Sequence, residues 1–462
     1  MSTNENNSQV VNLYQAHQKI YPREVKGIFQ NLRWICIWIT QLVFFLVPWL
    51  TWDSRQALLF DLAARRFYIF NIILYPQDLI YLTILLIICA LSLFLFTAVA
   101  GRLWCGYACP QTVYTEIFQW IERKFEGGFL SQQKLDQSSW GIKKTTIKGG
   151  KFLTWGIFSL WTGFTFSGFF TPIRPLFDEF INLSLSGWSF FWIIFYSIAT
   201  FGNAGFLREQ VCKYMCPYAR FQSAMFDRDT LIISYDEARG EPRGKLDAKN
   251  KGDCIDCNIC VQVCPTGIDI RNGLQYECIG CAACIDACDT VMEKIGKPKG
   301  LVRYTSETLL NNERKSFYQN IFRPRVIIYT IVLWSLILGL FYSLNQRNSF
   351  RVDIVKDRSV LSRLDQDGHV ENIYRFQMMN LIEENQTFKI YVSGIEGIQL
   401  DEADQTKTIT LNPAQSEWYV FHAEMDYEKA PEGKHKIFFT IESNETHDIV
   451  KEKSTFIVPK RR

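Results

Sequence analysis

Histidine is scarce in this chain, and its placement argues against one class of membrane protein. The five histidines are His17, His369, His422, His435 and His447, and none of them lies in a long apolar stretch. A haem held inside a membrane by two histidine ligands is therefore not expected. The long apolar stretches also lack Asp and Glu, so they offer no carboxylates for a buried proton relay. We expect the apolar part of the chain to be a platform for electron delivery.

Concentrated charge is also missing. The formal net charge is +3 over 462 residues, and the basic residues are not gathered in one patch. This argues against nucleic acid as a partner. Residues 1–33 are polar and contain no apolar core like that of a signal peptide, so we expect a cytoplasmic N-terminal tail. No cysteine occurs after residue 288, which excludes a disulfide or a thiolate metal site in the C-terminal part.

Five uncharged stretches are long enough to cross the roughly 30 Å hydrocarbon core of a bilayer at about 1.5 Å per helical residue. They cover residues 34–52, 79–101, 152–173, 187–207 and 326–343. The aromatic content of 15% fits lipid-facing and interface-anchoring surface. The sequence therefore predicts an α-helical membrane bundle of about five spans.

The distribution of Lys and Arg predicts how these spans are oriented. The loop after the second span contains Arg102, Arg123, Lys124, Lys134, Lys143, Lys144, Lys148 and Lys151. The loop between the third and fourth spans contains only Arg174, and the loop between the first two is intermediate, with Arg55, Arg65 and Arg66. We expect residues 1–33, the second loop and residues 208–325 to be cytoplasmic. The C-terminal domain is then periplasmic, in a multi-pass protein of the bacterial inner membrane.

Two cysteine runs of the form C-x2-C-x2-C-x3-C are the strongest motif. The first run is Cys254, Cys257, Cys260 and Cys264, and the second is Cys278, Cys281, Cys284 and Cys288. This is the ligand spacing of a bacterial two-cluster ferredoxin, in which the last cysteine of each run completes the cluster of the other. The predicted ligands are Cys254, Cys257, Cys260 and Cys288 for one [4Fe-4S] cluster, and Cys278, Cys281, Cys284 and Cys264 for the second.

Zinc and disulfides are the alternatives for these eight cysteines. Zinc generally takes four ligands from two separated pairs, and disulfides require an oxidising compartment. Both therefore fit the runs less well than iron–sulfur clusters do. Pro265 follows the first run as the ferredoxin pattern asks, whereas Asp289 stands where the second run would have its proline. This departure concerns the turn after Cys288 more than the ligands.

A second cysteine motif, C-x-Y-x-C-P, occurs twice. Cys105, Tyr107, Cys109 and Pro110 recur 107 positions later as Cys212, Tyr214, Cys216 and Pro217. Each copy follows a pair of predicted spans, which indicates an internal repeat that brings the two cysteine pairs together on the cytoplasmic side.

Several functions remain open for these four cysteines. On a helix, C-x3-C puts two sulfurs on one face, and soft thiolates select Cu(I), Zn or iron–sulfur iron. The four cysteines are therefore candidates for metal binding, for a redox dithiol, or for an additional cluster that bridges the repeat. The plain alternative is packing at the membrane boundary. The single cysteines Cys36 and Cys89 lie inside predicted spans, and packing is their expected role.

The segments around the clusters carry little further signal. Residues 208–253 are basic and rich in turns, with one predicted strand at 231–235, and the positive-inside rule explains their charge as a solvated cytoplasmic face. Residues 114–125 are amphipathic and are expected to lie along the membrane surface or to pack on the cluster domain.

The C-terminal part changes character. Residues 350–459 contain seven short alternating apolar stretches separated by Asp, Gly, Asn and Pro. Seven strands over such a length predict an all-β immunoglobulin-like sandwich. Its expected role is to bind a partner or to stabilise an assembly outside the membrane.

The sequence thus predicts a multi-domain chain. The expected parts are the tail, 1–33; a four-span region, 34–207, with the second C-x3-C-P motif extending to 217; a cytoplasmic region, 208–325, with the ferredoxin-like domain at about 245–295; a fifth span, 326–343; and the sandwich, 350–460.

The ordered set of motifs resembles a known family. The segments GRLWCGYACPQTV and CKYMCPYARFQ, the two ferredoxin runs, a late span and an immunoglobulin-like end are similar to the cytochrome c oxidase accessory proteins of the CcoG family, also called FixG or RdxA. The resemblance covers nearly the whole chain. It implies a membrane electron-transfer protein that matures a haem-copper oxidase and reduces Cu(II) to Cu(I). It also implies that the C-x3-C-P cysteines Cys105, Cys109, Cys212 and Cys216 handle copper.

This resemblance leads to a working hypothesis and two rivals. In the hypothesis, an unidentified cytoplasmic donor supplies electrons, and Cu(I) leaves to a copper chaperone, an exporter or an oxidase assembly factor. One rival is a quinol-linked membrane ferredoxin that feeds a reductase, although the C-terminal sandwich argues against it. The second rival is an assembly scaffold whose clusters are only structural.

Overall fold

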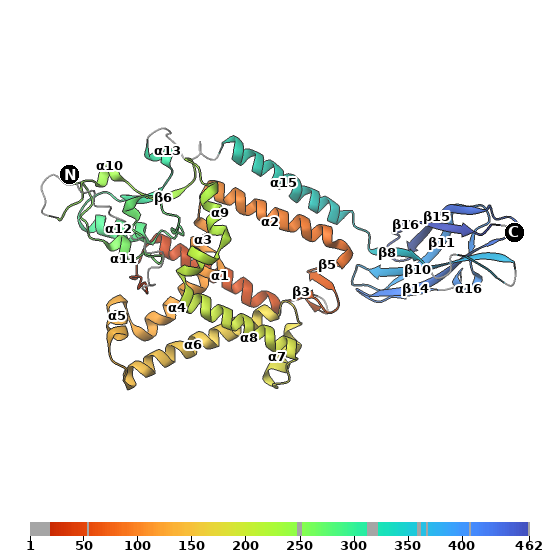
Figure 1. The fold of residues 1–462 in the computed structure, drawn as a ribbon, viewed down its shortest axis with the longest axis horizontal. Coiled ribbons are helices and arrows are strands. Elements are labelled where there is room, and N and C mark those ends of the chain that lie inside the picture. The colour runs from red at the N-terminus through yellow and green to blue at the C-terminus, as the bar shows by residue number, and fades with distance from the viewer. Residues whose placement is uncertain are drawn as a thin grey trace, which may run out of the picture. The chain divides into compact units, whose positions relative to one another are not determined.

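The computed structural model describes residues 19–52, 55–246, 252–311, 322–357, 362–365, 368–405 and 408–460. Residues 1–18 of the predicted tail, His17 among them, lie outside these ranges. The chain divides into two compact units, which we describe one at a time (Figure 1). The first contains residues 1–44, 90–166 and 187–331, and the second contains residues 45–89, 167–186 and 332–462.

Four helical segments are long and apolar enough to cross a membrane, by length and composition. They are Ile28–Trp49, Pro76–Ala100, Gly187–Leu207 and Pro324–Asn345. Their main helices are α1 (Ile28–Leu46), α2 (Leu79–Ala100), α8 (Gly187–Gly202) and α15 (Pro324–Asn345). Only 6% of the most apolar window of the second segment is buried within the protein. Apolar surface of this extent needs a non-aqueous environment, so the protein is a membrane protein.

The remaining predicted span falls on helix α6 (Ile142–Ser167). This helix ends six residues before the predicted bound at 173, and it is not among the four segments found by length and composition. Its first ten residues contain Lys143, Lys144, Lys148 and Lys151, which lower the hydropathy of that half. The predicted C-terminal bound of this stretch is wrong, because α6 ends at Ser167 and residues 168–172 form turns. Helix α1 likewise begins at Ile28, six residues before the predicted start.

In the first unit, the cysteine motifs lie among short helices and strands. In chain order after α2, these short elements are α3 (Leu103–Tyr107), α4 (Pro110–Glu126), α5 (Phe129–Gln137), η3 (Asn203–Leu207), η4 (Val211–Met215), α9 (Pro217–Met225), β6 (Ile232–Tyr235), α10 (Glu237–Gly240), α11 (Ile259–Gln262), η5 (Ile270–Asn272), α12 (Ala283–Lys294), β7 (Val302–Thr305) and α13 (Glu307–Leu310). The antiparallel pair β6–β7 brings the two ends of the cluster-binding segment together, with Ile232 opposite Thr305. The predicted strand at 231–235 is confirmed.

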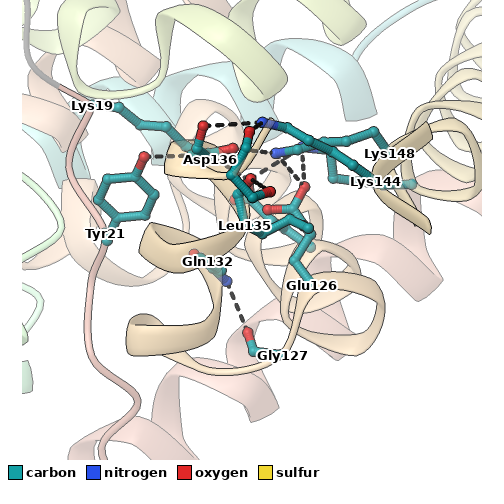
Figure 2. Close-up of polar contacts among 12 residues, drawn as sticks. Lys19, Tyr21, Glu126, Gly127, Gln132, Leu135, Asp136, Lys144 and Lys148 are labelled. Carbon is teal, nitrogen blue, oxygen red and sulfur yellow. Dashed lines mark hydrogen bonds and ion pairs between the residues drawn. The ribbon is translucent and has the colours of Figure 1, made fainter. Parts of the chain in front are cut away.

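A buried charge network fixes α4 against α5 and α6 (Figure 2). Lys148 lies 2.8 Å from a Glu126 oxygen and 2.6 Å from an Asp136 oxygen. Asp136 also receives a hydrogen bond of 2.6 Å from the Tyr21 hydroxyl and lies 3.0 Å from Lys19, so the segment before α1 is tied to the same network. Lys148 and Lys151, which were counted in the sequence as residues of a cytoplasmic loop, are thus ion-paired. Lys144, Lys148 and Lys151 are all buried.

The second unit contains the C-terminal sandwich. One sheet has the order β12-β14-β10-β8, with β9 also pairing with β10, and the other has the order β13-β11-β15-β16. The strands are β8 (Phe350–Lys356), β9 (Arg363–Leu364), β10 (His369–Asn380), β11 (Gln386–Ser393), β12 (Gln399–Leu400), β13 (Ile409–Leu411), β14 (Ser416–Asp426), β15 (Gly433–Ser443) and β16 (Ile449–Val458). All seven predicted strands are present. The short strands β9 and β12 and the helix α16 (Glu402–Gln405) were not predicted.

The sandwich core is aromatic and dry. Tyr374, Phe376 and Phe439 are each 0% exposed, and the ring of Phe439 lies 4.9 Å from each of the other two rings. Inward-facing residues alternate with exposed ones along β14 and β15, as expected for a sheet with one buried face.

The segment between α1 and α2 forms small sheets that also belong to the second unit. It contains η1 (Val47–Trp49), β1 (Thr51–Trp52), β2 (Arg55–Gln56), β3 (Leu58–Asp61), β4 (Arg66–Ile69), β5 (Ile72–Leu74) and η2 (Pro76–Asp78), and helix α7 (Ile173–Ile181) packs nearby against η1. The Tyr75 hydroxyl donates to the carbonyl oxygens of Asn380 (3.1 Å) and Ala414 (2.8 Å). Met379, Leu381 and Ala414 form an apolar core with residues of this segment. Within the second unit, the sandwich is therefore packed against the segment between α1 and α2.

Candidate iron–sulfur and metal-binding site

The eight run cysteines line two separate cavities. One cavity is lined by Cys254, Cys257, Cys260 and Cys288, together with Tyr235 and Arg271 among others. The second is lined by Cys264, Cys278, Cys281 and Cys284, and Cys260 lines both cavities. The last cysteine of each run thus lies with the first three of the other run, which is the crossed arrangement expected from the spacing. We call these sets the first and the second cysteine set.

The local backbone explains how each run wraps around its cavity. Helix α11 begins two residues after Cys257, and helix α12 begins two residues after Cys281. The residues between, Asn258 and Ala282, have positive φ angles of 57° and 59°. These matched left-handed positions turn the chain sharply between the second and third cysteines of each run, so that three sulfurs face one cavity. A left-handed alanine is uncommon, and Ala282 is held there in a fully buried position.

Burial raises the pKa of most of these thiols. It raises the pKa of Cys260 to about 11, and it raises those of Cys278 and Cys288 to about 12. The pKa of Cys284 is also raised, first by burial and then by the neighbouring cysteines Cys281 and Cys278. Bare thiolates are unfavourable in such a setting, whereas thiolates bound to iron are neutralised by the metal. Eight soft donors in two enclosed sets fit iron–sulfur clusters.

The two sets differ in exposure. Cys257 of the first set is exposed, whereas Cys281 of the second set is buried. The segment before α1 covers part of the second set, because Val25 packs with Cys281 and Cys284 and the Arg23 N–H donates to the Gln262 carbonyl at 2.9 Å.

The first turn of α1 is also fastened to the cluster-binding domain. The buried carboxylate of Asp286, on α12, accepts from the backbone N–H groups of Phe29 (3.3 Å) and Gln30 (2.8 Å). These N–H groups have no partner within their own helix, and a carboxylate is a favourable acceptor at a helix N-terminus.

The C-x3-C-P cysteines lie at a break between two helices, not on one helical face. Cys105 is in α3, but Cys109 is extended, with φ −61° and ψ 128°, and precedes α4. Cys212 is in η4, and Cys216 precedes α9 in the same way. Pro110 and Pro217 are the first residues of their helices, where a missing N–H costs nothing. The expectation of two sulfurs on one helix is wrong, because the residue before a proline avoids the helical conformation.

The two copies of the motif are close to each other, as the repeat predicted. Burial, and then the charges of Cys109 and Cys216, raise the pKa of Cys212 to about 11. Burial likewise raises the pKa of Cys105 to about 12, with contributions from Cys109 and Cys212. The four sulfurs of Cys105, Cys109, Cys212 and Cys216 therefore form one group, which we call the four-cysteine group.

Both copies contact the second cysteine set. A Cβ atom at Gly106 would lie 2.8 Å from the Gly280 oxygen and 2.9 Å from the Cα atom of Cys281, so only glycine permits this approach. In the other copy, Lys213 donates to the Thr266 carbonyl at 3.1 Å, and the Thr266 hydroxyl lies 3.3 Å from the Cys264 sulfur. The second set, and not the first, is thus the neighbour of the four-cysteine group.

Arg102 and Tyr304 hold this junction together, and sequence reasoning missed both. The Arg102 guanidinium donates to the carbonyl oxygens of Cys278 (3.0 Å) and Ala219 (2.6 Å), and also to that of Tyr276. The Tyr304 hydroxyl donates to the Gly280 carbonyl at 2.7 Å. Arg102 lies three residues before Cys105, and this position could have indicated a role at the site. The sequence around Tyr304 contains no motif that indicates such a role.

The four-cysteine group is wider than a site for one ion with three or four protein ligands. Among the described residues, the only three His, Cys, Asp or Glu side chains whose ligand atoms all lie within 4.8 Å of one another are Asp401, Asp404 and His422. Soft thiolates select Cu(I), Zn or iron–sulfur iron, so the four cysteines have the donor chemistry for copper or for a further cluster.

Gln222 is the other feature of this site that sequence reasoning missed. It is 0% exposed, and its Oε1 accepts from the Cys105 thiol at 3.3 Å. Gln222 lies in α9, directly after the second motif, so its side chain links the two copies of the repeat.

The sandwich also contains an unexpected set of possible ligands, Asp401, Asp404 and His422. The histidines of the sandwich were predicted to be ordinary surface or core residues. Asp404 accepts from both the backbone N–H and the ring Nδ1 of His422, at 2.8 and 3.0 Å. These hydrogen bonds account for the close approach without a metal.

Comparison with known families agrees with this organisation. The profile described as "4Fe-4S dicluster domain" matches residues 207–307, and the one described as "4Fe-4S binding domain" matches residues 82–127. The profile described as "IG-like fold at C-terminal of FixG, putative oxidoreductase" matches residues 340–459. The first motif, with Cys105 and Cys109, thus lies in a region that resembles iron–sulfur domains.

Three curated relatives match most of the chain. Protein RdxB of Cereibacter sphaeroides is 38% identical over 423 residues, which is 88% of each chain. Protein RdxA of the same organism is 37% identical and covers 84% of this chain and 85% of its own. The nitrogen fixation protein FixG of Rhizobium meliloti is 35% identical, with 85% and 82% covered. A solved FixG-related protein from Vibrio parahaemolyticus matches 24% of this chain and 97% of its own, at 20% identity and a TM-score of 0.22.

Proposed function

The chain belongs to the FixG/RdxA family and is a membrane iron–sulfur electron-transfer protein, and from this premise we propose that it reduces Cu(II) to Cu(I) for the maturation of a cytochrome c oxidase. The activity would be that of a cupric reductase, with copper as the substrate.

The proposed ligands of two [4Fe-4S] clusters are the two cysteine sets. Cys254, Cys257, Cys260 and Cys288 would hold one cluster, and Cys264, Cys278, Cys281 and Cys284 would hold the second. Such clusters, when bound, supply electrons one at a time, which is the stoichiometry that Cu(II) requires. The chain's own contribution is to exclude water from the second set and to hold it against the four-cysteine group through Arg102 and Gly106.

The proposed copper site is the four-cysteine group, Cys105, Cys109, Cys212 and Cys216. The observation that carries this proposal is the direct contact of both motif copies with the loops of the second cysteine set. Thiolates prefer Cu(I) over Cu(II), so binding at this group favours the reduced ion. Cys212 also lines a pocket with the buried charged residues Arg33, Glu116, Arg208 and Glu209, so one cysteine of the group borders a polar cavity.

The proposed topology follows the charge bias of the sequence. The N-terminus and the ferredoxin-like domain would be cytoplasmic, in the bacterial inner membrane, and the sandwich would be periplasmic. A cytoplasmic donor would deliver electrons. A copper chaperone, a copper exporter or an oxidase assembly factor would receive Cu(I), and the sandwich would bind a partner outside the membrane.

A second candidate for the four-cysteine group is an additional iron–sulfur cluster. The "4Fe-4S binding domain" match over residues 82–127, which contain Cys105 and Cys109, favours it. Iron content distinguishes the two cases, because two clusters give about eight iron atoms per chain and three give about twelve.

The test is a variant in which Cys105, Cys109, Cys212 and Cys216 are all replaced by Ser. We expect it to keep the iron–sulfur absorption and the iron content of the wild type, while losing Cu(I) binding and Cu(II) reduction. The control is the double replacement of Cys36 and Cys89, the cysteines within α1 and α2, which should change neither property. Unchanged copper stoichiometry and Cu(II) reduction in the fourfold variant would refute the copper site.

A further inference from the structure

A single charged side chain, that of Arg271, faces the cavity of the first cysteine set. The other described residues that line this cavity are cysteines or uncharged residues. Arg271 lies in η5, in the segment between the two cysteine runs, and its side chain is only 8% exposed. The described lining of the second cavity contains no Asp, Glu, Lys, Arg or His. A positive charge thus lies at the wall of one cavity and not of the other.

The Arg271 guanidinium fastens the loop that carries Cys257. It donates to Oδ1 of Asp256 at 2.7 Å and to Oδ1 of Asn258 at 2.6 Å. These two residues flank Cys257, and both have positive φ angles, 50° and 57°. Asp and Asn adopt this conformation more readily than most residues, but it is uncommon for them as well. One side chain therefore holds both sides of the loop around the exposed cysteine of the first set.

A second carboxylate fixes the direction of the guanidinium. Asp269 accepts from Nε of Arg271 at 2.8 Å and from Nη2 at 2.6 Å, and it also accepts from the Arg271 backbone N–H at 3.0 Å. A bidentate pair of this kind sets the orientation of the arginine. Neither Asp256 nor Asp269 is among the residues that line the first cavity. The arginine borders the cavity, whereas the carboxylates that balance its charge do not.

The matching loop of the second run is built without such a clamp. The counterparts of Asp256 and Asn258 are Gly280 and Ala282, which also have positive φ angles, 69° and 59°. The backbone conformation is thus the same, but neither residue has a side-chain acceptor for an arginine. The Gly280 carbonyl accepts instead from the neutral Tyr304 hydroxyl at 2.7 Å.

Charge at a cluster cavity bears on electron uptake. Reduction adds one electron, and so one negative charge, to a cluster held by four thiolates, and its potential depends on local charge, hydrogen bonds and solvent exposure. A cation that faces the cavity stabilises the reduced state more than the oxidised state.

We propose that Arg271 is a positioning residue of the first cluster, which fixes the loop around Cys257 and raises the reduction potential of that cluster. This inference rests on the proposed cluster at the first cysteine set, and it does not depend on copper. It assigns separate effects to the charge of Arg271 and to its forked shape. The charge acts on the potential, and the fork protects the exposed edge of the cluster.

The experiment is an anaerobic redox titration of the full-length, iron-loaded protein, followed by electron paramagnetic resonance. Arg271→Gln removes the charge, and Arg271→Lys keeps the charge but loses the fork. Cys257→Ser identifies which signal belongs to the first cluster. The matched control is Arg239→Gln. Arg239 also pairs with an aspartate, Asp253, at 2.6 Å and donates to the Lys299 carbonyl, but it lines neither cavity.

We expect Arg271→Gln to lower the potential of the first cluster by at least about 59 mV, which is a tenfold change in a one-electron equilibrium. The second cluster should shift less. Arg271→Lys and the control should stay close to the wild type. Both Arg271 variants should release iron to a chelator faster than the wild type and the control, because both lose the fork.

An unchanged potential in Arg271→Gln, with about eight iron atoms per chain, would overturn the role of Arg271 and leave the clusters standing. An equal fall in Arg271→Gln and Arg271→Lys would also overturn it, because a purely structural role predicts that result. A wild-type protein with about four iron atoms and one reducible signal would overturn the proposed cluster together with this inference.

A further variant decides the matter if Arg271→Gln does not hold the first cluster. Asp256→Asn keeps an acceptor for the guanidinium but removes one of the negative charges that balance it. The potential of the first cluster should then rise, and an unchanged or lower potential would refute the inference.

Discussion

The cluster-binding domain and the C-terminal sandwich are stabilised in different ways. The sandwich has long strands, a continuous aromatic core and no cysteine. The cluster-binding domain has short helices, and its two small cores include Cys254 and Cys281 themselves. The first kind of fold is specified by alternating apolar residues, whereas the second depends on what its cysteines bind. We therefore expect metal binding and folding to be coupled in the cluster-binding domain and independent in the sandwich.

Removal of iron should produce the largest difference in stability between the two domains. Chelation under oxidising conditions removes the groups around which the two cysteine runs fold, so residues 252–311 should lose backbone protection while β10, β14 and β15 keep theirs. Hydrogen exchange of the full-length protein, followed by mass spectrometry, measures both regions at once. Equal loss of protection in the sandwich would contradict the independence of the two folds.

Phe439→Ala should produce the reverse pattern. Phe439 is 0% exposed and packs against Tyr374 and Phe376, so its truncation should destabilise the sandwich by about 3–5 kcal/mol. Iron content and Cu(I) affinity should stay at wild-type values. Unfolding of the sandwich is measured in denaturant by hydrogen exchange of its peptides. Metal analysis is done on the same sample. Truncation of the exposed Tyr391 is the control and should have little effect.

Glu122→Gln tests whether buried charge stabilises the helices that support the site. Burial alone would raise the pKa of Glu122, but Arg208, Lys19 and Lys151 outweigh burial and lower it to about 2. At neutral pH, this lowering of the Glu122 pKa on folding contributes on the order of 3 kcal/mol to the free energy of unfolding.

This contribution depends on pH in a defined direction. A carboxylate whose pKa falls on folding stabilises the protein above its unfolded pKa of about 4.3, and the contribution is lost as the pH falls toward 2. The difference in unfolding free energy between the wild type and Glu122→Gln should therefore be largest at neutral pH and shrink in acid. Glu307→Gln, in an exposed pair with Arg228, should cost less than about 1 kcal/mol. A difference that grows in acid would contradict the account.

Ser306→Ala should have the smallest effect. The Ser306 hydroxyl accepts from the Leu309 N–H at 3.4 Å and caps α13, next to the strand β7 that closes the cluster-binding domain. Loss of such a cap costs about 1 kcal/mol. A small decrease in unfolding free energy with unchanged iron content is expected, and loss of iron in this variant would show a stronger link between β7 and the cysteine sets than the contacts indicate.

The parts of the site that were predictable are those with a fixed spacing. The spacing of the two cysteine runs predicted which cysteines meet, because in two-cluster ferredoxins the last cysteine of each run joins the first three of the other. The repeat offset predicted that Cys105 and Cys212 come together. The seven sandwich strands were predictable from the alternation of apolar residues. In each case the information lies within a short stretch of chain.

The parts that were not predictable depend on contacts between distant segments. Gln222 and Tyr304 look ordinary in sequence and gain their roles from neighbours about 117 and 24 positions away, Cys105 and Gly280. Lys148 was counted as a residue of a cytoplasmic loop, yet it lies in α6 and is buried with Glu126. The helix break before Pro110 was predictable from the proline alone, and the expectation of a single helical face gave too little weight to it.

The central claim is that the chain holds two clusters in the crossed cysteine sets and copper at the four-cysteine group. The most direct measurement is a joint count of iron and copper in the purified protein, with electron paramagnetic resonance before and after reduction by dithionite. The account predicts about eight iron atoms per chain, reducible cluster signals, and Cu(I) that is lost when Cys105, Cys109, Cys212 and Cys216 are replaced by Ser. About twelve iron atoms, or copper that survives this replacement, would contradict it.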